Sequence, residues 1–186
     1  STDFVKAFDP LPFHILVELA REAGAKEHIL LALSGMHSQL ERHFKLGGGL
    51  VGRGFCSTNG ILQGCPISVI LLNLASQTWI NMMKAEFPTA KPRAYADDWA
   101  VSVESSRKLI LALRRTAEMA DDLGMQISPG KSLVWATCPE LRLELSNIEL
   151  QGERIPLVQE ARYLGAFIGF DRRRHRTRVA RHLDPC

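Results

Sequence analysis

The chain has 186 residues, 46% hydrophobic and 23% charged, proportions that are typical of a globular protein and exclude a largely disordered one. The formal net charge of +3 comes from the end of the chain, because the stretch from Asp171 onward holds six arginines and two aspartates. We therefore expect one domain at residues 1–170 and a basic tail at 171–186 that either pairs with phosphates or starts a solvated helix.

No segment of the sequence predicts a membrane span, because the longest apolar stretch, residues 67–75, is far shorter than the roughly 20 residues required. The first residues show no secretory signal and no initiator methionine, so we expect an internal fragment. The cysteines lie far apart and form no zinc-binding pattern with the histidines, which predicts reduced thiols and an intracellular protein. The four cysteines are Cys56, Cys65, Cys138 and Cys186.

The first half of the chain predicts a short strand, three helices and a hairpin. Residues 1–8 suit the strand, and helical spacing of apolar residues runs from Phe13 until Gly24. A second helix takes its apolar face from positions 30, 33, 37, 40 and 44. It ends at the glycines 47–49, before a hairpin that runs through Phe55. Pro66 suits the first turn of a third, mostly buried helix that extends to about residue 86.

The second half predicts a hairpin, one more helix and several short strands. Residues 94–103 suit two strands with a tight turn at positions 97 and 98. Ser105 or Ser106 caps a fourth helix that Gly124 ends. Short strands are then expected at 127, 133–135, 143–145, 148–150, 155–158 and 163–170, with turns at 129–130 and 151–152. This order predicts an α+β domain, with helices on one face of an antiparallel sheet.

Two adjacent carboxylates at the predicted turn are the sharpest chemical feature. Asp97 and Asp98 repel each other and resist burial between apolar strands. Neighbouring side chains on a strand point to opposite faces, so the two converge only at a turn. A divalent cation would remove the repulsion, and hard oxygen ligands favour Mg²⁺. The alternative interpretation is an ordinary surface turn.

A third carboxylate, Asp3, lies in the otherwise apolar strand near the start of the sequence. Helix capping explains Asp9, which precedes Pro10, better than it explains Asp3. Three aspartates are the minimum set that bridges two metal ions about 4 Å apart. Such a pair of ions activates an attacking hydroxyl and stabilises a departing pyrophosphate.

Five segments resemble, in order, the successive palm motifs of reverse transcriptases: residues 3–9, 59–68, 95–98, 124–131 and 163–165. The Lys-Ala-Phe-Asp end of the first motif and the Gln-Gly-Cys-Pro of the second are most similar to retroelements without long terminal repeats, of the long interspersed element type. Group II intron enzymes come next. The resemblance covers nearly the whole chain and implies a ferredoxin-like palm at 1–170, with the start of a thumb in the tail.

This resemblance implies roles for the residues at the acidic site. Asp3, Asp97 and Asp98 would bind two Mg²⁺ ions, with Mn²⁺ as an alternative, and the backbone carbonyl of Phe4 would add a ligand. Lys131 matches a lysine that lies near the departing pyrophosphate and acts as a general acid. An exposed lysine after a turn is the alternative interpretation of Lys131.

The resemblance also implies contacts to nucleotide, primer and template. Phe8 matches a bulky ring that excludes ribonucleotides at the 2′ position, although Phe8 alone also suits an ordinary core. Gln63 and Gly64 match the loop that touches the incoming nucleotide, and a helix-start turn is the alternative there. The residues that match primer and template contacts are Tyr95, Tyr163, Leu164 and Gly165.

The implied activity is RNA-directed DNA polymerisation with Mg²⁺, deoxynucleoside triphosphates, an RNA template and a DNA primer. Val69, Leu62 and Thr2 depart from the family pattern, which puts activity rather than ancestry in question. Fingers motifs before Asp3 and a thumb after residue 170 are missing, so we expect the fragment alone to be inactive. The alternatives are a non-catalytic nucleic-acid-binding module, maturase-like or a decayed copy, and an RNA-templated RNA polymerase.

Overall fold

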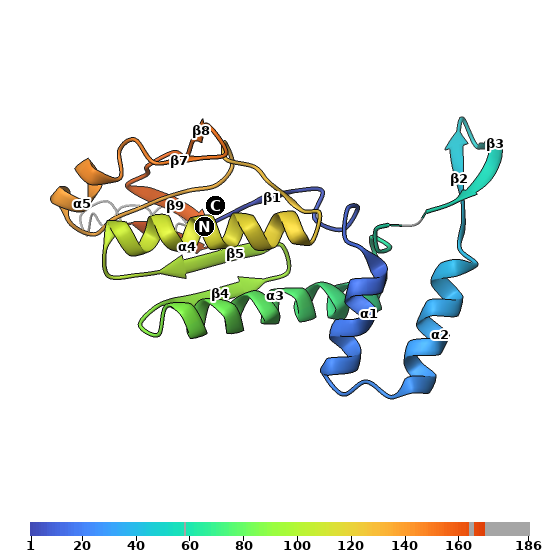
Figure 1. Cartoon of the computed structure of the whole chain (residues 1–186). Coiled ribbons are helices and arrows are strands. Elements are labelled where there is room, and N and C mark those ends of the chain that lie inside the picture. The colour runs from blue at the N-terminus through green and yellow to red at the C-terminus, as the bar shows by residue number, and fades with distance from the viewer. Residues whose placement is uncertain (58, 164–165, 170–186) are drawn as a thin grey trace, which may run out of the picture.

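The computed structural model describes residues 1–57, 59–163 and 166–169 of the chain (Figure 1). Helices and short antiparallel strand pairs alternate along it, so the expected α+β class is confirmed. The elements are β1 (Phe4–Val5), α1 (Phe13–Glu22), α2 (Glu27–Ser38), β2 (Glu41–Leu46), β3 (Gly49–Cys56), α3 (Pro66–Glu86), β4 (Lys91–Tyr95), β5 (Asp98–Ser102), α4 (Ser106–Asp122), β6 (Gln126–Ile127), α5 (Pro139–Glu144), β7 (Glu149–Leu150), β8 (Glu153–Arg154), β9 (Glu160–Tyr163) and β10 (Ala166–Gly169).

Three of the helices begin and end where the sequence predicts. α3 starts at Pro66, because a proline needs no hydrogen-bond acceptor for its nitrogen in the first turn. α4 is capped by Ser105, whose hydroxyl accepts a hydrogen bond from the backbone N–H of Lys108 at 3.3 Å. α1 starts at Phe13 and stops just before Gly24, which has a φ of +88°.

The predicted second helix is wrong in its last part, since α2 ends at Ser38 and Phe44 belongs to strand β2. A spacing of four residues puts Leu40 and Phe44 on one face of a helix, but it also puts them on one face of a strand. The glycines at 47 and 48 form the turn of the β2–β3 hairpin, with φ values of +56° and +91°, instead of ending a helix.

Other strand predictions fail in the last third of the chain. Residues 143–145 were expected to be extended, yet α5 runs to Glu144, because Pro139 starts a helix that places Leu141 and Leu145 one turn apart. Residues 133–135 and 155–158 contribute only an isolated parallel bridge between Val134 and Leu157. The strands expected near 127 and 148–150 are confirmed as β6 and β7. Of the strand expected at 163–170, position 163 belongs to β9 and 166–169 to β10, and positions 164, 165 and 170 lie outside the described residues.

The central strands form two antiparallel pairs that one isolated bridge connects. β4 pairs with β5, and Thr2 forms an antiparallel bridge with Trp99 of β5. β1 begins two residues after Thr2 and pairs with β6, where Phe4 is opposite Ile127. The first strand therefore lies between β5 and β6, while α3 packs against β4 and α4 against β5 and β6 (Figure 1).

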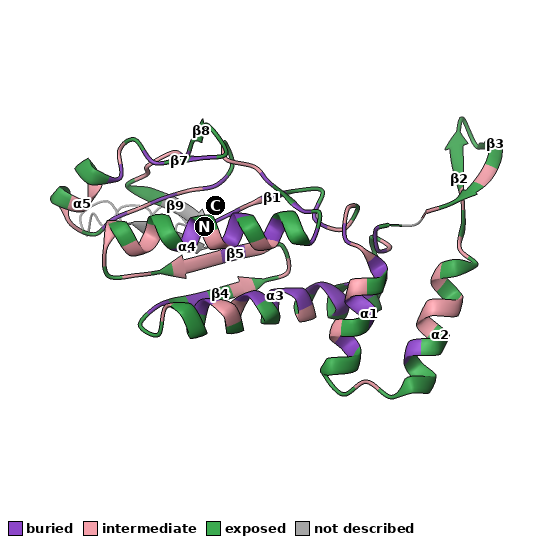
Figure 2. Cartoon of the chain, viewed as in Figure 1, coloured by how far each residue is buried: buried purple, intermediate pink, exposed green. Residues whose placement is uncertain are grey.

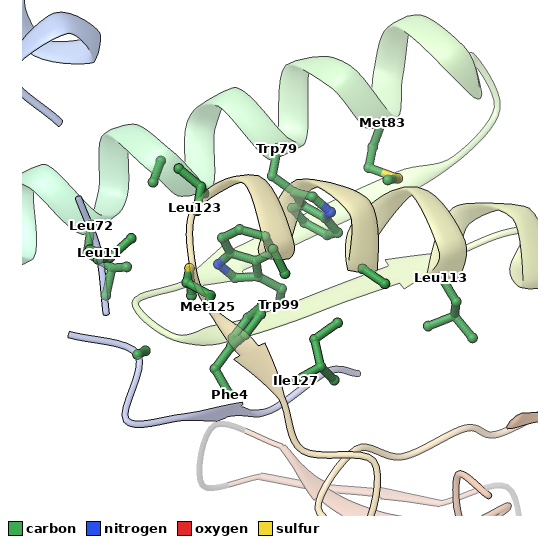
Figure 3. Packing of buried hydrophobic residues seen from close by; sticks show 14 of the residues in the cluster. Phe4, Leu11, Leu72, Trp79, Met83, Trp99, Leu113, Leu123, Met125 and Ile127 are labelled. Carbon is green, nitrogen blue, oxygen red and sulfur yellow. The ribbon is translucent and has the colours of Figure 1, made fainter. Parts of the chain in front are cut away.

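Aromatic rings fill the core beneath these strands (Figure 3). The fully buried Trp99 stacks on Trp79 with ring centres 4.9 Å apart and meets the edge of Phe4 at 4.8 Å. Both indole N–H groups have partners: Trp99 donates to the Ser76 hydroxyl at 2.9 Å, and Trp79 donates to the Thr116 hydroxyl at 3.0 Å. Buried polar groups are stable when they are paired in this way, so the core fixes the position of β5.

Burial is uneven along the chain (Figure 2). The helices α1, α3 and α4 each bury one face, whereas α2 buries only Leu30 and the β2–β3 hairpin buries none of its strand residues. No helix in the described part of the chain is both long and apolar enough to span a membrane. Cys56, Cys65 and Cys138 are free thiols, as expected, and the basic tail at 171–186 lies outside the described residues.

Candidate active site

Strand pairing brings Asp3 and Asp98 to the same place. The Thr2 backbone N–H donates to the Trp99 carbonyl at 2.8 Å, and the Trp99 N–H donates to the Thr2 carbonyl at 3.4 Å. In an antiparallel register, the residue after Thr2 stands opposite the residue before Trp99, so Asp3 faces Asp98. Side chains that are opposite each other in such a pair have Cβ atoms about 4.5–5.5 Å apart and point to one face.

The turn that carries Asp97 is supported from the core side. Ala96 has a φ of +51°, a backbone conformation that is unfavourable for a residue with a side chain. Its carbonyl oxygen accepts hydrogen bonds from the Ser76 hydroxyl and from the Trp99 indole N–H, both at 3.2 Å. These two buried donors hold the turn, and with it the exposed Asp97, at the end of the β4–β5 hairpin.

Electrostatics indicates that Asp97 and Asp3 both act on Asp98. Partial burial raises the pKa of Asp98 above its usual value, and the neighbouring charges of Asp97 and Asp3 raise it further. Asp3 and Asp98 are half-buried, while Asp97 is exposed. The strand register therefore places Asp3 opposite Asp98, and the effect of Asp3 and Asp97 on the pKa of Asp98 is consistent with their closeness.

The site fits a divalent cation by charge and donor type. Carboxylate oxygens are the hard ligands that Mg²⁺ prefers, and a cation would lower the raised pKa of Asp98. Within the described residues, no group of three or more histidine, cysteine, aspartate or glutamate side chains is arranged so that it could hold a metal ion. The fit thus rests on the shared negative charge at Asp3, Asp97 and Asp98 rather than on a preformed coordination shell.

A loop at residues 128–133 clamps the backbone on both sides of Asp3. The Asp3 N–H donates to the hydroxyl of the buried Ser132 at 3.2 Å, and that hydroxyl donates to the Ser128 carbonyl at 2.8 Å. The Ser128 N–H returns a bond to the Asp3 carbonyl at 2.8 Å. Lys131 is exposed and directly precedes Ser132, so its backbone lies beside the acidic site. Sequence reasoning missed Ser132, because a serine after a turn is an ordinary surface feature.

The residues predicted to contact the nucleotide also come together. The Ile61 N–H donates to the Phe8 carbonyl at 2.9 Å, which joins the segment after Asp3 to the segment before Gln63. Phe8 is half-buried and packs against the core, and Gln63 and Gly64 are exposed in the turn that leads into α3. The segment that carries Phe8 and the turn at 63 and 64 are therefore neighbours.

Asp9 has a role that the sequence did not indicate. Helix capping was the expected explanation, but Pro12 is the N-cap residue of α1 and the helix has no side-chain cap. Instead, an Asp9 carboxylate oxygen accepts a hydrogen bond from the side-chain amide of Gln63 at 3.2 Å. This bond holds the Gln63 side chain against the segment that carries Phe8.

The remaining predicted contact residues occupy distinct places. Phe4 is buried against Trp99 and follows Asp3 directly, while Tyr95 is 68% exposed at the end of β4. Tyr163 ends β9, and Leu164 and Gly165 lie outside the described residues.

A comparison with families of known proteins identifies the relationship. The family model described as Reverse transcriptase (RNA-dependent DNA polymerase) matches residues 1–168. A search of curated proteins found no match. Because the family match covers most of the sequence and the fold is a mixed, palm-like arrangement of helices and antiparallel strands, the chain belongs to the reverse transcriptase family.

Proposed function

We propose that this chain is the palm of an RNA-directed DNA polymerase that extends a DNA primer on an RNA template. The observation that carries the proposal is the joint placement of Asp3, Asp97 and Asp98. Partial burial, and then the charges of Asp97 and Asp3, raise the pKa of Asp98 at the start of β5. Like charges held together in this way are favourable only when a cation neutralises them.

Asp3, Asp97 and Asp98 would hold two Mg²⁺ ions, or Mn²⁺ in their place, with the Phe4 carbonyl as a further ligand. The ions supply Lewis acidity to the primer hydroxyl and to the departing pyrophosphate. The loop around Ser132 and the buried Trp99 keep two of these carboxylates in place. Their contribution is to fix the charge before the substrate arrives.

The nucleotide would lie between the Phe8 segment and the turn at Gln63 and Gly64. Phe8 is backed by the core, so its ring resists displacement by a 2′-hydroxyl and selects deoxynucleoside triphosphates. The Gln63 amide is oriented by Asp9, and the nearby N-terminus of α3 favours phosphate oxygens. Lys131 would donate a proton from its Nζ to the departing pyrophosphate.

The origin that best suits the motifs is a retroelement without long terminal repeats, ahead of a group II intron. This assignment rests on the Lys-Ala-Phe-Asp and Gln-Gly-Cys-Pro sequences. In the same proposal, residues 1–170 are the palm and 171–186 begin a thumb. In this proposal the protein works inside the cell. The residues that contact primer or template are Tyr95, Tyr163, Leu164 and Gly165.

Primer extension on an RNA template tests the activity, with the longest natural polypeptide that contains this sequence. Asp97→Ala is expected to reduce extension by about 100-fold or more, because it removes a charge that stabilises the transition state. Asp122→Ala, an exposed aspartate at the end of α4, is the matched control and keeps full activity. Equal extension by wild type and Asp97→Ala would refute the proposal.

Two further measurements separate catalysis from binding. Mn²⁺ binding, measured by paramagnetic relaxation, is expected to be lost in Asp3→Asn. If the wild-type protein binds RNA but does not extend a primer, the non-catalytic nucleic-acid-binding module is favoured instead. Phe8→Ala is expected to admit ribonucleotides, and unchanged sugar discrimination would contradict the steric role of Phe8.

A further inference from the structure

The β2–β3 hairpin presents an uncovered apolar surface away from the core. It projects beyond the end of α2 (Figure 1), and none of its fourteen strand residues is buried. An isolated two-stranded hairpin is only marginally stable in water. An exposed apolar surface of this size therefore indicates a binding partner. The exposed apolar residues of the hairpin are Phe44 (64%), Leu46 (68%), Leu50 (69%), Val51 (47%) and Phe55 (42%).

Two of these side chains form an aromatic platform. The rings of Phe44 and Phe55 are stacked with their centres 5.3 Å apart and their planes at 29°. Phe44 is opposite Val51 in the strand register, and Phe55 is opposite Arg42, so a guanidinium group neighbours the ring pair. Stacked, solvent-exposed rings offer flat surfaces to other flat, conjugated groups.

The charge of the hairpin identifies the class of partner. Arg42, Lys45 and Arg53 stand against a single acidic residue, Glu41. Among the described residues, none of these three cations forms an ion pair, and the buried Arg42 Nε has no hydrogen-bond partner. A second copy of the same hairpin would bring like charges together, which is unfavourable. A polyanion that also carries flat rings fits both features.

We propose that the β2–β3 hairpin binds a single-stranded nucleic acid. Bases stack on Phe44 and Phe55, while Arg42, Lys45 and Arg53 pair with the phosphates. The identification of this strand as template or primer rests on the proposed polymerase function. Gln63 follows Cys56, the last residue of β3, by only seven positions, so the hairpin adjoins the Gln63 turn in the sequence.

Fluorescence anisotropy with a labelled polyuridylate RNA and the 186-residue chain tests the stacking. Phe44→Ala combined with Phe55→Ala is expected to weaken binding by about tenfold or more. Phe→Leu at both positions keeps an apolar surface without rings and is expected to weaken binding similarly. Wild-type affinity in the leucine variant would overturn base stacking.

A salt titration tests the phosphate contacts. Replacing Arg42, Lys45 and Arg53 by alanine is expected to reduce the slope of log affinity against log salt by about 2, since each contact to a single strand contributes about 0.7. The control removes three exposed cations from helices α3 and α4: Lys84, Arg107 and Arg114. An equal loss in the control would overturn the assignment to the hairpin.

Two outcomes distinguish this inference from its competitors. If sedimentation shows that wild type self-associates through Phe44 and Phe55 while RNA affinity does not change in their variants, the hairpin is an interface between copies and the inference is wrong. The anisotropy assay contains no nucleotide and measures affinity alone, so a failure of the proposed catalysis leaves the binding result intact. Circular dichroism checks that each variant is folded.

Discussion

Gly60→Ala tests the contact between the segment that carries Phe8 and Asp9 and the segment that precedes Gln63. Gly60 has a φ of +86°, and a Cβ atom there would lie 2.6 Å from the carbonyl oxygen of Asp9 and 3.2 Å from its carbonyl carbon. The left-handed conformation costs an L-residue about 1–2 kcal/mol. The collision involves backbone that has no alternative rotamer and adds about 1–3 kcal/mol.

Gly64→Ala is the matched control, because Gly64 has nearly the same φ, +84°, but no atom within 4 Å of the added Cβ. We expect Gly60→Ala to lower the free energy of unfolding by about 2–5 kcal/mol and Gly64→Ala by about 1–2 kcal/mol. Urea unfolding, followed by the fluorescence of the buried Trp79 and Trp99, measures both values. Equal losses would show that Gly60 does not touch Asp9.

Three other substitutions test the site and its support. The pKa of Asp98 is higher in the folded than in the unfolded state, so its stabilising contribution is present at low pH and is lost as the pH rises through the folded-state pKa. In urea titrations, Asp98→Asn should therefore be more stable than wild type at about pH 7 and equal to it at about pH 3. Thr116→Val leaves the buried indole N–H of Trp79 unpaired and should lower the free energy of unfolding by about 1–3 kcal/mol. The same change should cost less in a Trp79→Phe background, where no indole N–H loses its partner, and an equal cost in both backgrounds would exclude the hydrogen bond as the cause. Ser105→Ala should destabilise by about 0.5–2 kcal/mol and Ser105→Gly by only a few tenths, as measured by thermal unfolding, and equal effects would argue against capping.

The sequence predicts helices well where local chemistry marks both ends. α3 lies between Pro66 and Pro88, and α4 between a serine cap and Gly124, so little depends on distant contacts. Residues 40–44 carry no such marks. Their apolar spacing suits helix and strand equally, and only pairing with β3 decides between them.

Asp97 and Asp98 stood out in the sequence because two adjacent carboxylates lie between apolar strands, and Asp3 because it lies in an apolar strand. The positive φ of Ala96 and the Ser132 clamp on Asp3 carry no local sequence mark, since each depends on a partner far along the chain. Asp9 illustrates the same limit: the residues around it suggested a helix cap, while the bond to Gln63 spans 54 positions.

The bridge between Thr2 and Trp99 joins residues that are 97 positions apart. Closing so long a segment carries an entropic cost, and contacts of large sequence separation slow folding relative to local ones. During synthesis, α1, α2 and α3 are complete before β5 leaves the ribosome. Asp3 can therefore face Asp98 only after residue 98 has been translated, and a nascent chain that ends before β4 carries α1, α2 and α3 without this pairing.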